Sequence, residues 1–113
     1  MLSKRYRFHS RGGVRHTYQN GKTIRGSRIS LVFAENSRGK QRYAVVVRKK
    51  VMKSAVGRNR IRRRVYEAIR LEKAKIEKPV DCIFIVYNRE VVTMEFAELQ
   101  KLIADLLKEA QIL

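Results

Sequence analysis

Two segments in the first half of the chain alternate between apolar and polar positions, as in a strand with one face in a core. The first strand is expected over residues 29–33 and the second over 43–47, with a turn at 36–40 between them. The core face of the two strands is formed by Ile29, Leu31, Phe33, Tyr43, Val45 and Val47. The opposite face of the second strand carries Ala44, Val46 and Arg48, so it is partly apolar and ends in a cation.

Helical spacing appears after the second strand. A helix that begins near Arg58 places an apolar stripe at i, i+4, i+7 and i+8, and the chain cannot continue it through Pro79. The stripe consists of Ile61, Val65, Ala68 and Ile69. The near-continuous apolar run over 80–87 predicts a central strand that is covered on both sides.

A last helix is expected over about residues 94–110, with Thr93 as its N-cap. Its core face is formed by Phe96, Leu99, Ile103, Leu106, Leu107 and Ala110. A short helix over 14–18, ended by Gly21, and a short strand over 23–25 complete the pattern. The order of elements predicts a single α+β domain, residues 1–113, built as a two-layer sandwich.

Charge is distributed very unevenly along this chain. The net charge is +17, and residues 1–64 hold 20 Lys/Arg with one acid, Glu35, against 7 Lys/Arg and 9 acids in residues 65–113. The first half is therefore the expected binding half, and its partner is expected to be a polyanion. Residues 1–11 form a basic N-terminal arm that is either a frayed tail or a segment that orders against RNA.

The start of the arginine-rich helix argues for the same partner. Cations in the first turns of a helix oppose its macrodipole, and they repel one another at i, i+3 and i, i+4 spacing. Local stability therefore disfavours the sequence from Arg58 to Arg64, whereas a bound anion would offset both costs. Among the aromatic residues, Tyr43, Phe84 and Tyr87 are interpreted as core or half-buried strand residues, and Tyr18 is the better candidate for ligand contact.

Several other classes of protein are disfavoured. The sequence has no apolar run of 18 residues and no apolar segment near its start, so we expect neither a membrane span nor a secretory signal. The single Cys82 fits a reducing compartment, and we expect a cytoplasmic protein in which this thiol is a buried strand residue. No phosphate-binding glycine loop, dinucleotide fingerprint or zinc-ligand spacing is present.

His9 and His16 are the only histidines, and they leave two alternatives open. They could act as an acid–base pair that cleaves RNA, which would make the chain a small protein-only ribonuclease. The simpler interpretation, which we favour, is a pair of surface histidines in a basic segment. A structural RNA-binding protein of the ribosomal type is a third class that the composition allows.

The segment from Arg48 to Arg64 resembles the signature of the bacterial ribonuclease P protein family. It contains a basic turn with Lys49 and Lys50 and then the Arg58-Asn59-Arg60 start of a helix. The resemblance continues through Arg7-Phe8, the 14–21 segment, the 29–33 strand and the 98–107 helix. It implies a fold similar to ribosomal protein S5 domain 2, with a left-handed βαβ crossover. Handedness statistics alone would favour a right-handed one.

The resemblance also implies a function. Members are accessory subunits of a ribozyme that removes the 5′ leader from precursor tRNA. Catalysis, with magnesium ions, belongs to the RNA, so no protein catalytic residues are expected, and the protein is expected to be a monomer in a 1:1 complex with that RNA. The residues implied to face the catalytic RNA are Lys49, Lys50, Lys53, Arg58, Asn59, Arg60, Arg62 and Arg63. The residues implied to form a leader-binding cleft are Val14, Tyr18, Val32, Ala44, Val46 and Arg48.

Two of the cleft positions depart from the family pattern. Val14 stands where the family usually has an aromatic residue, so one stacking contact is expected to be weaker. Arg48 stands where serine is more common, and it adds charge to the floor of the cleft.

Overall fold

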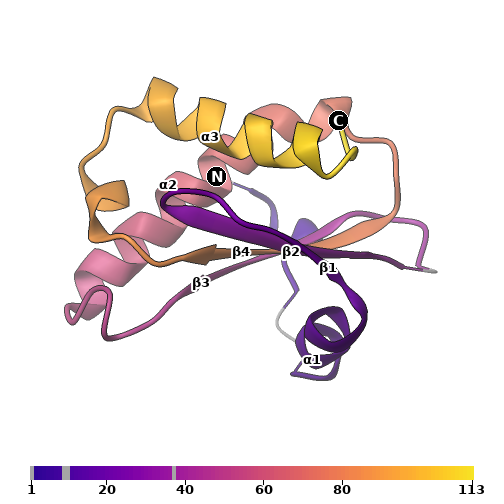
Figure 1. The fold of residues 1–113 in the computed structure, drawn as a ribbon, viewed down its shortest axis with the longest axis horizontal. Helices are drawn as coiled ribbons and strands as arrows, with labels where there is room; N and C mark the ends of the chain where they lie inside the picture. The colour runs from indigo at the N-terminus through magenta and orange to yellow at the C-terminus, as the bar shows by residue number, and fades with distance from the viewer. Residues whose placement is uncertain (1, 9–10, 37) are drawn as a thin grey trace.

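The fold is that of a computed structural model, which describes residues 2–8, 11–36 and 38–113. These residues form four strands, three α-helices and three short 3₁₀ helices (Figure 1). In chain order they are η1 (Lys4–Tyr6), α1 (Arg11–Asn20), β1 (Lys22–Ile24), β2 (Ile29–Glu35), β3 (Arg42–Val47), α2 (Ala55–Glu72), η2 (Lys73–Lys75), β4 (Val80–Val86), η3 (Arg89–Val92) and α3 (Phe96–Glu109). No described helix has the length and apolar character needed to cross a membrane.

The strands form one sheet in the order β1-β2-β4-β3. β4 lies in the middle, antiparallel to β2 and parallel to β3, so that Phe84 is paired with Leu31 on one side and Val45 on the other. Helices α2 and α3 cover one face of the sheet, and α1 lies against the other (Figure 1). The predicted two-layer α+β architecture is confirmed, and α1 adds a partial third layer.

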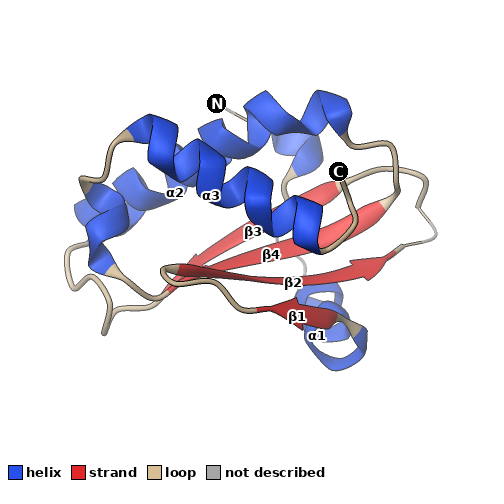
Figure 2. Ribbon diagram, turned by 45° about the horizontal axis from the view of Figure 1, so that its top comes forward, coloured by secondary structure: helices blue, strands red, loops and turns tan. Residues whose placement is uncertain are grey.

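The connection from β3 through α2 to β4 is a left-handed crossover. Seen from the helix layer with β3 and β4 pointing upward, the chain leaves β3, passes along α2 and enters β4 on the left (Figures 1 and 2). This hand is the one that the family resemblance implies, and it opposes the usual preference for right-handed crossovers.

The main core lies between the sheet and helices α2 and α3. All four residues of the α2 stripe are fully buried there, as the helical spacing predicts: Ile61, Val65, Ala68 and Ile69. The strand faces were also assigned correctly, since Ile29, Leu31, Tyr43, Val45 and Val47 belong to this core. A smaller core on the opposite face contains Phe8, Val32, Ala44 and Ile83, with Val14, Val46 and Ile85 packed against it.

Two helix starts differ from the sequence-based expectation. Helix α2 begins at Ala55, ahead of Arg58, because the side chain of Ser54 caps it by accepting a hydrogen bond from the Gly57 backbone N–H at 3.1 Å. The prediction of Thr93 as the N-cap of the last helix is wrong. Thr93 follows η3, and α3 begins at Phe96 after Glu95, whose side chain makes no capping bond.

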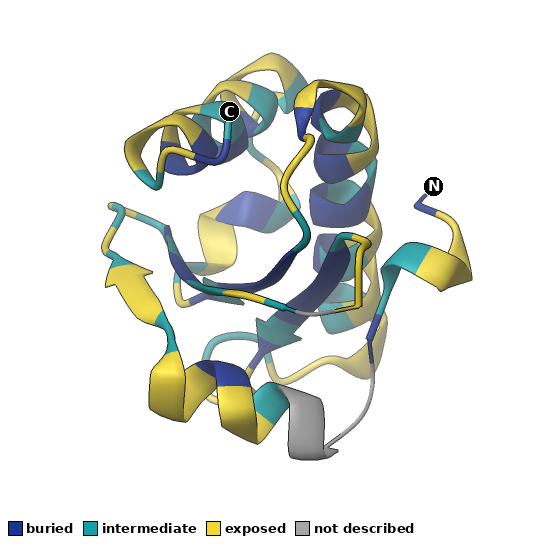
Figure 3. Ribbon diagram, turned by 90° about the vertical axis from the view of Figure 1, so that its right-hand side faces the viewer, coloured by how far each residue is buried: buried dark blue, intermediate teal, exposed yellow. Residues whose placement is uncertain are grey.

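Helix α1 is longer than the predicted 14–18 segment and ends against β2. A Cβ atom on Gly21 would lie 2.4 Å from the Thr17 carbonyl oxygen and 2.7 Å from the Phe33 carbonyl oxygen, so only glycine fits where the helix turns into β1. Figure 3 shows α1, exposed over most of its described length, on the side of the sheet away from α2 and α3.

The described part of the N-terminal arm is packed against the domain. Leu2 is buried in the main core and Phe8 in the smaller one, at 1% and 4% exposure. Between them Arg7 bridges Tyr43 on the free edge of β3, and the Phe8 N–H donates to the Tyr43 carbonyl at 3.0 Å. Residues 2–8 therefore pass around this edge of the sheet, from one core to the other.

Candidate nucleic-acid interface

The first turns of α2 and the loop before them carry the residues that were assigned to the catalytic RNA. Lys49, Lys50, Lys53, Asn59, Arg60 and Arg63 have exposed side chains, while Arg58 and Arg62 are half-buried. The loop is held in a turn in which the N–H groups of Val51 and Met52 both donate to the Arg48 carbonyl. The structure thus gathers these residues at one end of the molecule, next to the carboxyl ends of β3 and β4.

Arg58 has a different environment from its neighbours. Its Nη1 donates to the carbonyl oxygens of Met52 and Lys53, at 2.9 and 2.8 Å. A guanidinium bonded to two backbone carbonyls fixes the loop on the start of the helix. Arg58 therefore holds the basic loop in place. Only those N–H groups of Arg58 that do not bind the two carbonyls can donate to a ligand.

Arg64, which the resemblance does not assign to the RNA, binds the protein itself. Its Nη1 donates to Val91 and Val92 carbonyls at 3.1 and 2.9 Å, and its Nη2 donates to the Met94 carbonyl. Burial and the nearby charge of Arg60 both lower the pKa of Arg64. This cation joins α2 to η3, whereas Arg60 on the preceding turn is exposed.

Asn59, Arg62 and Arg63 lie on another side of α2. Asn59, Arg62, Arg63 and Tyr66 are spaced at i, i+3, i+4 and i+7, and with Arg7 they line a pocket of about 400 Å³. The Asn59 side-chain oxygen accepts a hydrogen bond from Arg62 Nη1 at 2.6 Å. The amide thereby orients one guanidinium along the pocket.

The six residues assigned to a leader cleft meet on the α1 side of the sheet. Val32 and Ala44, 4% and 7% exposed, belong to the small core on this face, and Val14 and Val46 are half-buried against it. The side chains open to a ligand are Tyr18, which is 42% exposed, and Arg48. Burial raises the pKa of the Tyr18 hydroxyl, and the positive charge of Arg48 opposes this shift.

Sequence reasoning missed a further aromatic residue on this face. Ile83 and Ile85 belong to the smaller core on the α1 side of β4, and Tyr87, directly after the strand, continues their spacing of two. It is 44% exposed and, with Lys50, Val51, Asn88 and Arg89, lines a pocket of about 400 Å³. The alternation of strand residues could have indicated the position of this ring, but the near-continuous apolar run suggested that the residue is buried.

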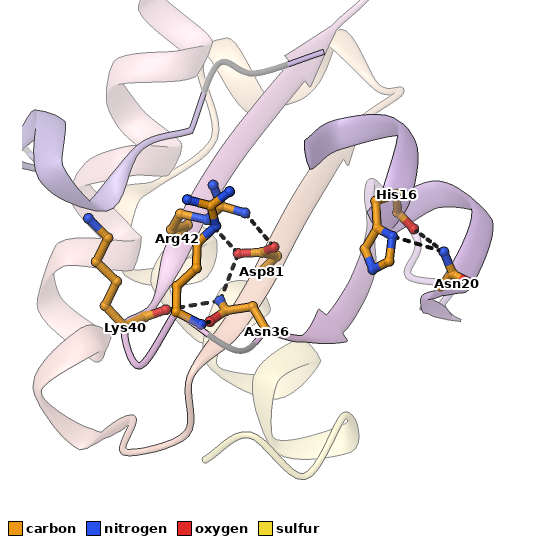
Figure 4. A network of polar contacts seen from close by, with 7 residues as sticks. His16, Asn20, Asn36, Lys40, Arg42 and Asp81 are labelled. Carbon is orange, nitrogen blue, oxygen red and sulfur yellow. Dashed lines mark hydrogen bonds and ion pairs between the residues drawn. The ribbon is translucent and has the colours of Figure 1, made fainter. Parts of the chain in front are cut away.

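Arg42, a cation of the basic half, is bound inside the protein and is not available to a ligand. Arg42 is buried and donates to both carboxylate oxygens of Asp81, and Asn36 donates to the same carboxylate at 2.9 Å (Figure 4). The ion pair raises the pKa of Arg42 further. The charge of the first half is therefore not all at the surface.

The other groups considered for chemistry are dispersed. His16 is exposed on α1, where its Nδ1 accepts a hydrogen bond from Asn20 Nδ2 at 3.1 Å (Figure 4), and His9 lies outside the described residues. Cys82 is fully buried, and burial raises the pKa of its thiol. Within the described ranges no three His, Cys, Asp or Glu side chains are grouped in a way that could hold a metal ion.

Comparisons with known proteins identify the family of this chain. The family model described as Ribonuclease P matches residues 2–111. The chain is 35% identical over 94 residues to the ribonuclease P protein component of Pelotomaculum thermopropionicum, covering 83% of this chain and 82% of that one. It is 34% identical to the ribonuclease P protein component of Chloroflexus aurantiacus, covering 99% of this chain and 82% of that one.

Solved structures share the fold. The RNase P protein of Staphylococcus aureus, in a mutant form with defective mRNA degradation activity, superposes with a TM-score of 0.85 at 24% identity, over 97% of this chain and 92% of that one. The RNase P protein of Thermotoga maritima superposes with a TM-score of 0.81 at 24% identity, over 91% of this chain and 96% of that one. With the family model matching almost the whole sequence, the chain belongs to the ribonuclease P protein family.

Proposed function

We propose that this chain is the protein subunit of a ribonucleoprotein that removes the 5′ leader of precursor tRNA. In this proposal the basic loop and the first turns of α2 bind the catalytic RNA, and the α1 side of the sheet binds the leader. The RNA and its magnesium ions carry out the cleavage, and the protein acts as a monomer in a 1:1 complex in the cytoplasm. Family membership supports the assignment to tRNA processing.

The observation that carries the RNA-binding part is the set of exposed cations near the start of α2. Arg60 and Arg63 are exposed in the second and third turns of α2, and no described carboxylate pairs with either of them. Their neighbours Arg58 and Arg64 are held by backbone carbonyls and so keep the helix and its loop in place. A rigid, unneutralised strip of cations fits a folded polyanion better than a flexible tail would.

The cleft supports a separate contact with single-stranded RNA. An apolar floor, the exposed rings of Tyr18 and Tyr87, and the cation of Arg48 are the features used to bind unpaired nucleotides, by base stacking and phosphate contact. Because α1 lies on one face of the sheet and α2 on the other, a leader and the catalytic RNA can bind without competing.

Binding to the catalytic RNA tests the proposal directly. Purified protein should bind this RNA in the presence of excess ribosomal RNA, and the affinity should fall steeply with salt. Equal competition by ribosomal RNA, together with co-sedimentation with ribosomal subunits, would instead support the ribosomal-type alternative. A protein-only ribonuclease that uses His9 and His16 should cleave RNA without the catalytic RNA and lose that activity in His9→Gln and His16→Gln; absence of cleavage by the protein alone would remove this alternative.

A further inference from the structure

Glu35 is the one acid among residues 1–64, a half of the chain that carries 20 Lys/Arg. Its side chain is exposed at the end of β2, and it makes no ion pair or hydrogen bond with any described group. A carboxylate repels the phosphates of a nucleic acid, so it does not help to bind the backbone. It can instead accept hydrogen bonds from the N–H groups of a base.

Glu35 lines a pocket of about 420 Å³ between the second half of α1 and the end of β2. Strand β1 begins at Lys22, which is paired with Phe33, so no described strand covers this edge of β2 beyond Phe33. The pocket lies beside that uncovered edge. Its lining combines an imidazole, an amide, an ammonium, an aromatic ring, a methyl group and a carboxylate, from His16, Asn20, Lys22, Phe33, Ala34 and Glu35.

The polar groups of the pocket leave both donors and acceptors open. Asn20 Nδ2 donates to the Nδ1 and to the carbonyl oxygen of His16, each at 3.1 Å, so its Oδ1 remains an acceptor (Figure 4). Because His16 Nδ1 accepts, the neutral imidazole carries its proton on Nε2 and donates there. Lys22 is exposed and pairs with no described carboxylate.

This set of groups distinguishes among the bases of RNA. Guanine has two adjacent donors, N1–H and N2–H, beside the acceptor O6, and these match the two oxygens of a carboxylate and a nearby ammonium. Adenine has the lone pair of N1 at the corresponding place, and uracil has carbonyl oxygens on both sides of its single N–H, so a carboxylate repels both. Cytosine offers only one amino group. Phe33 and Ala34 provide an apolar wall for a flat ring.

We propose that this pocket binds one guanine base of the leader of precursor tRNA, with Glu35 accepting from N1–H and N2–H and Lys22 donating to O6. The leader as the source of the base rests on the proposed function, which puts single-stranded RNA on the α1 side of the sheet. None of the lining residues belongs to the set that the family resemblance assigns to the leader cleft. The pocket thus adds a base preference to that cleft. A free guanine nucleotide presents the same base, and the test separates the two sources.

The first experiment titrates the full chain with the 5′-monophosphates of guanosine, inosine, adenosine and cytidine. All four carry the same phosphate, so differences between them come from the base. The backbone amide of Glu35 and the side-chain amide of Asn20 are followed in ¹⁵N NMR spectra. Guanosine monophosphate should bind with saturation, inosine monophosphate, which lacks the 2-amino group, about tenfold more weakly, and adenosine monophosphate not measurably. Equal responses to the guanosine and adenosine nucleotides, or a stronger one to cytidine monophosphate, would overturn the guanine assignment.

The second experiment measures the affinity of the assembled ribonucleoprotein for precursor tRNAs that differ at one leader position. A single guanosine is placed at successive positions of a leader that otherwise consists of adenosines. At one position it should tighten binding by about tenfold relative to the all-adenosine leader. No preference at any position would overturn the leader as the source of the base.

Glu35→Gln should abolish the preference for that guanosine. The matched control is Glu98→Gln, which removes an exposed carboxylate from α3, on the other side of the sheet, and should keep the preference (Figure 1). Glu35→Gln also removes a negative charge and so strengthens the binding of every leader, which is why the ratio of the two affinities is the readout. An unchanged ratio in Glu35→Gln would show that this carboxylate does not bind the base.

The two experiments separate this inference from the proposed function. Selective binding of guanosine monophosphate without a preference among leaders would support a site for a free guanine nucleotide. Failure of the assembled complex to bind any precursor tRNA would contradict the proposed function, and the nucleotide titration would still decide whether the pocket binds guanine.

Discussion

Arg42 and Asp81 form a two-point ion pair between neighbouring strands, with Nε to Oδ1 at 2.8 Å and Nη2 to Oδ2 at 2.7 Å. The same guanidinium lies 4.8 Å from the centre of the Phe8 ring, so the pair also supports the N-terminal arm. The two side chains are only 11% and 4% exposed. A chain with a net charge of +17 thus uses one of its cations, and one of its few acids, to join the edge strand β3 to the sheet.

Breaking this pair should destabilise the fold strongly. Asp81→Asn leaves the buried Arg42 charge without its counter-ion, and we expect the free energy of unfolding in urea to fall by about 3–5 kcal/mol. Glu90→Gln is the matched control, because it breaks the more exposed pair with Arg28, and it should cost less than about 1 kcal/mol. Similar losses in the two variants would contradict a structural role for the Arg42–Asp81 pair.

Neighbouring arginines of α2 should separate into binding and structural groups. Arg60→Ala should weaken binding to the catalytic RNA and lower the salt slope by about one, with the unfolding free energy nearly unchanged, because its side chain is exposed. Arg64→Ala removes the donors to three carbonyls of the η3 region and should lower the unfolding free energy by about 1–3 kcal/mol. Urea denaturation beside RNA binding at several salt concentrations measures both effects, and the reverse pattern would refute the division.

Replacing Tyr18 should weaken the binding of precursor tRNA and leave binding to the catalytic RNA unchanged. Tyr18→Ala removes an exposed ring, so the affinity of the assembled enzyme for precursor tRNA should fall by about five- to a hundredfold, and its affinity for mature tRNA should not change. Tyr18→Phe keeps the ring and should behave like the parent protein. Equal losses for precursor and mature tRNA would show that this face does not bind the leader.

Part of the acid sensitivity of the fold should come from Glu67. Its pKa is lowered from 4.5 to about 2, and its hydrogen bonds with Arg70 are the largest cause. A carboxyl group whose pKa is lower in the folded state adds stability above its unfolded pKa and loses it as the pH falls, here between about 4.5 and 2. Glu67→Gln should therefore flatten the loss of unfolding free energy over that range, modestly because the pair is partly exposed. An unchanged acid profile would contradict this contribution.

The sequence predicted buried positions best where the geometry of a strand or a helix imposes a regular spacing on them. Alternation placed Val32 and Ala44 on the face opposite Leu31 and Val45, because successive strand residues must point to opposite sides. The α2 stripe was found for the same reason. The handedness of the crossover came only from the family resemblance, because no local pattern encodes it.

Features that depend on backbone partners could not be read in this way. Arg58 and Arg64 look like the other cations of α2, yet their acceptors are carbonyl oxygens in loops whose path the sequence does not specify. Thr93 is a good capping residue, but it ends a 3₁₀ turn here. Leu2 lies in a basic segment and has no periodicity that would predict its burial.

In the proposed function the protein assists a catalytic RNA through two separate surfaces, the start of α2 with its basic loop and the α1 side of the sheet. The most direct measurement is cleavage of precursor tRNA at low magnesium by the catalytic RNA alone, by the protein alone, and by the two together. We predict little cleavage by either component and full 5′ maturation by the mixture, reduced by Arg60→Ala through RNA binding and by Tyr18→Ala through precursor binding. Robust cleavage by the protein without the RNA, or a mixture no more active than the RNA alone, would contradict the account.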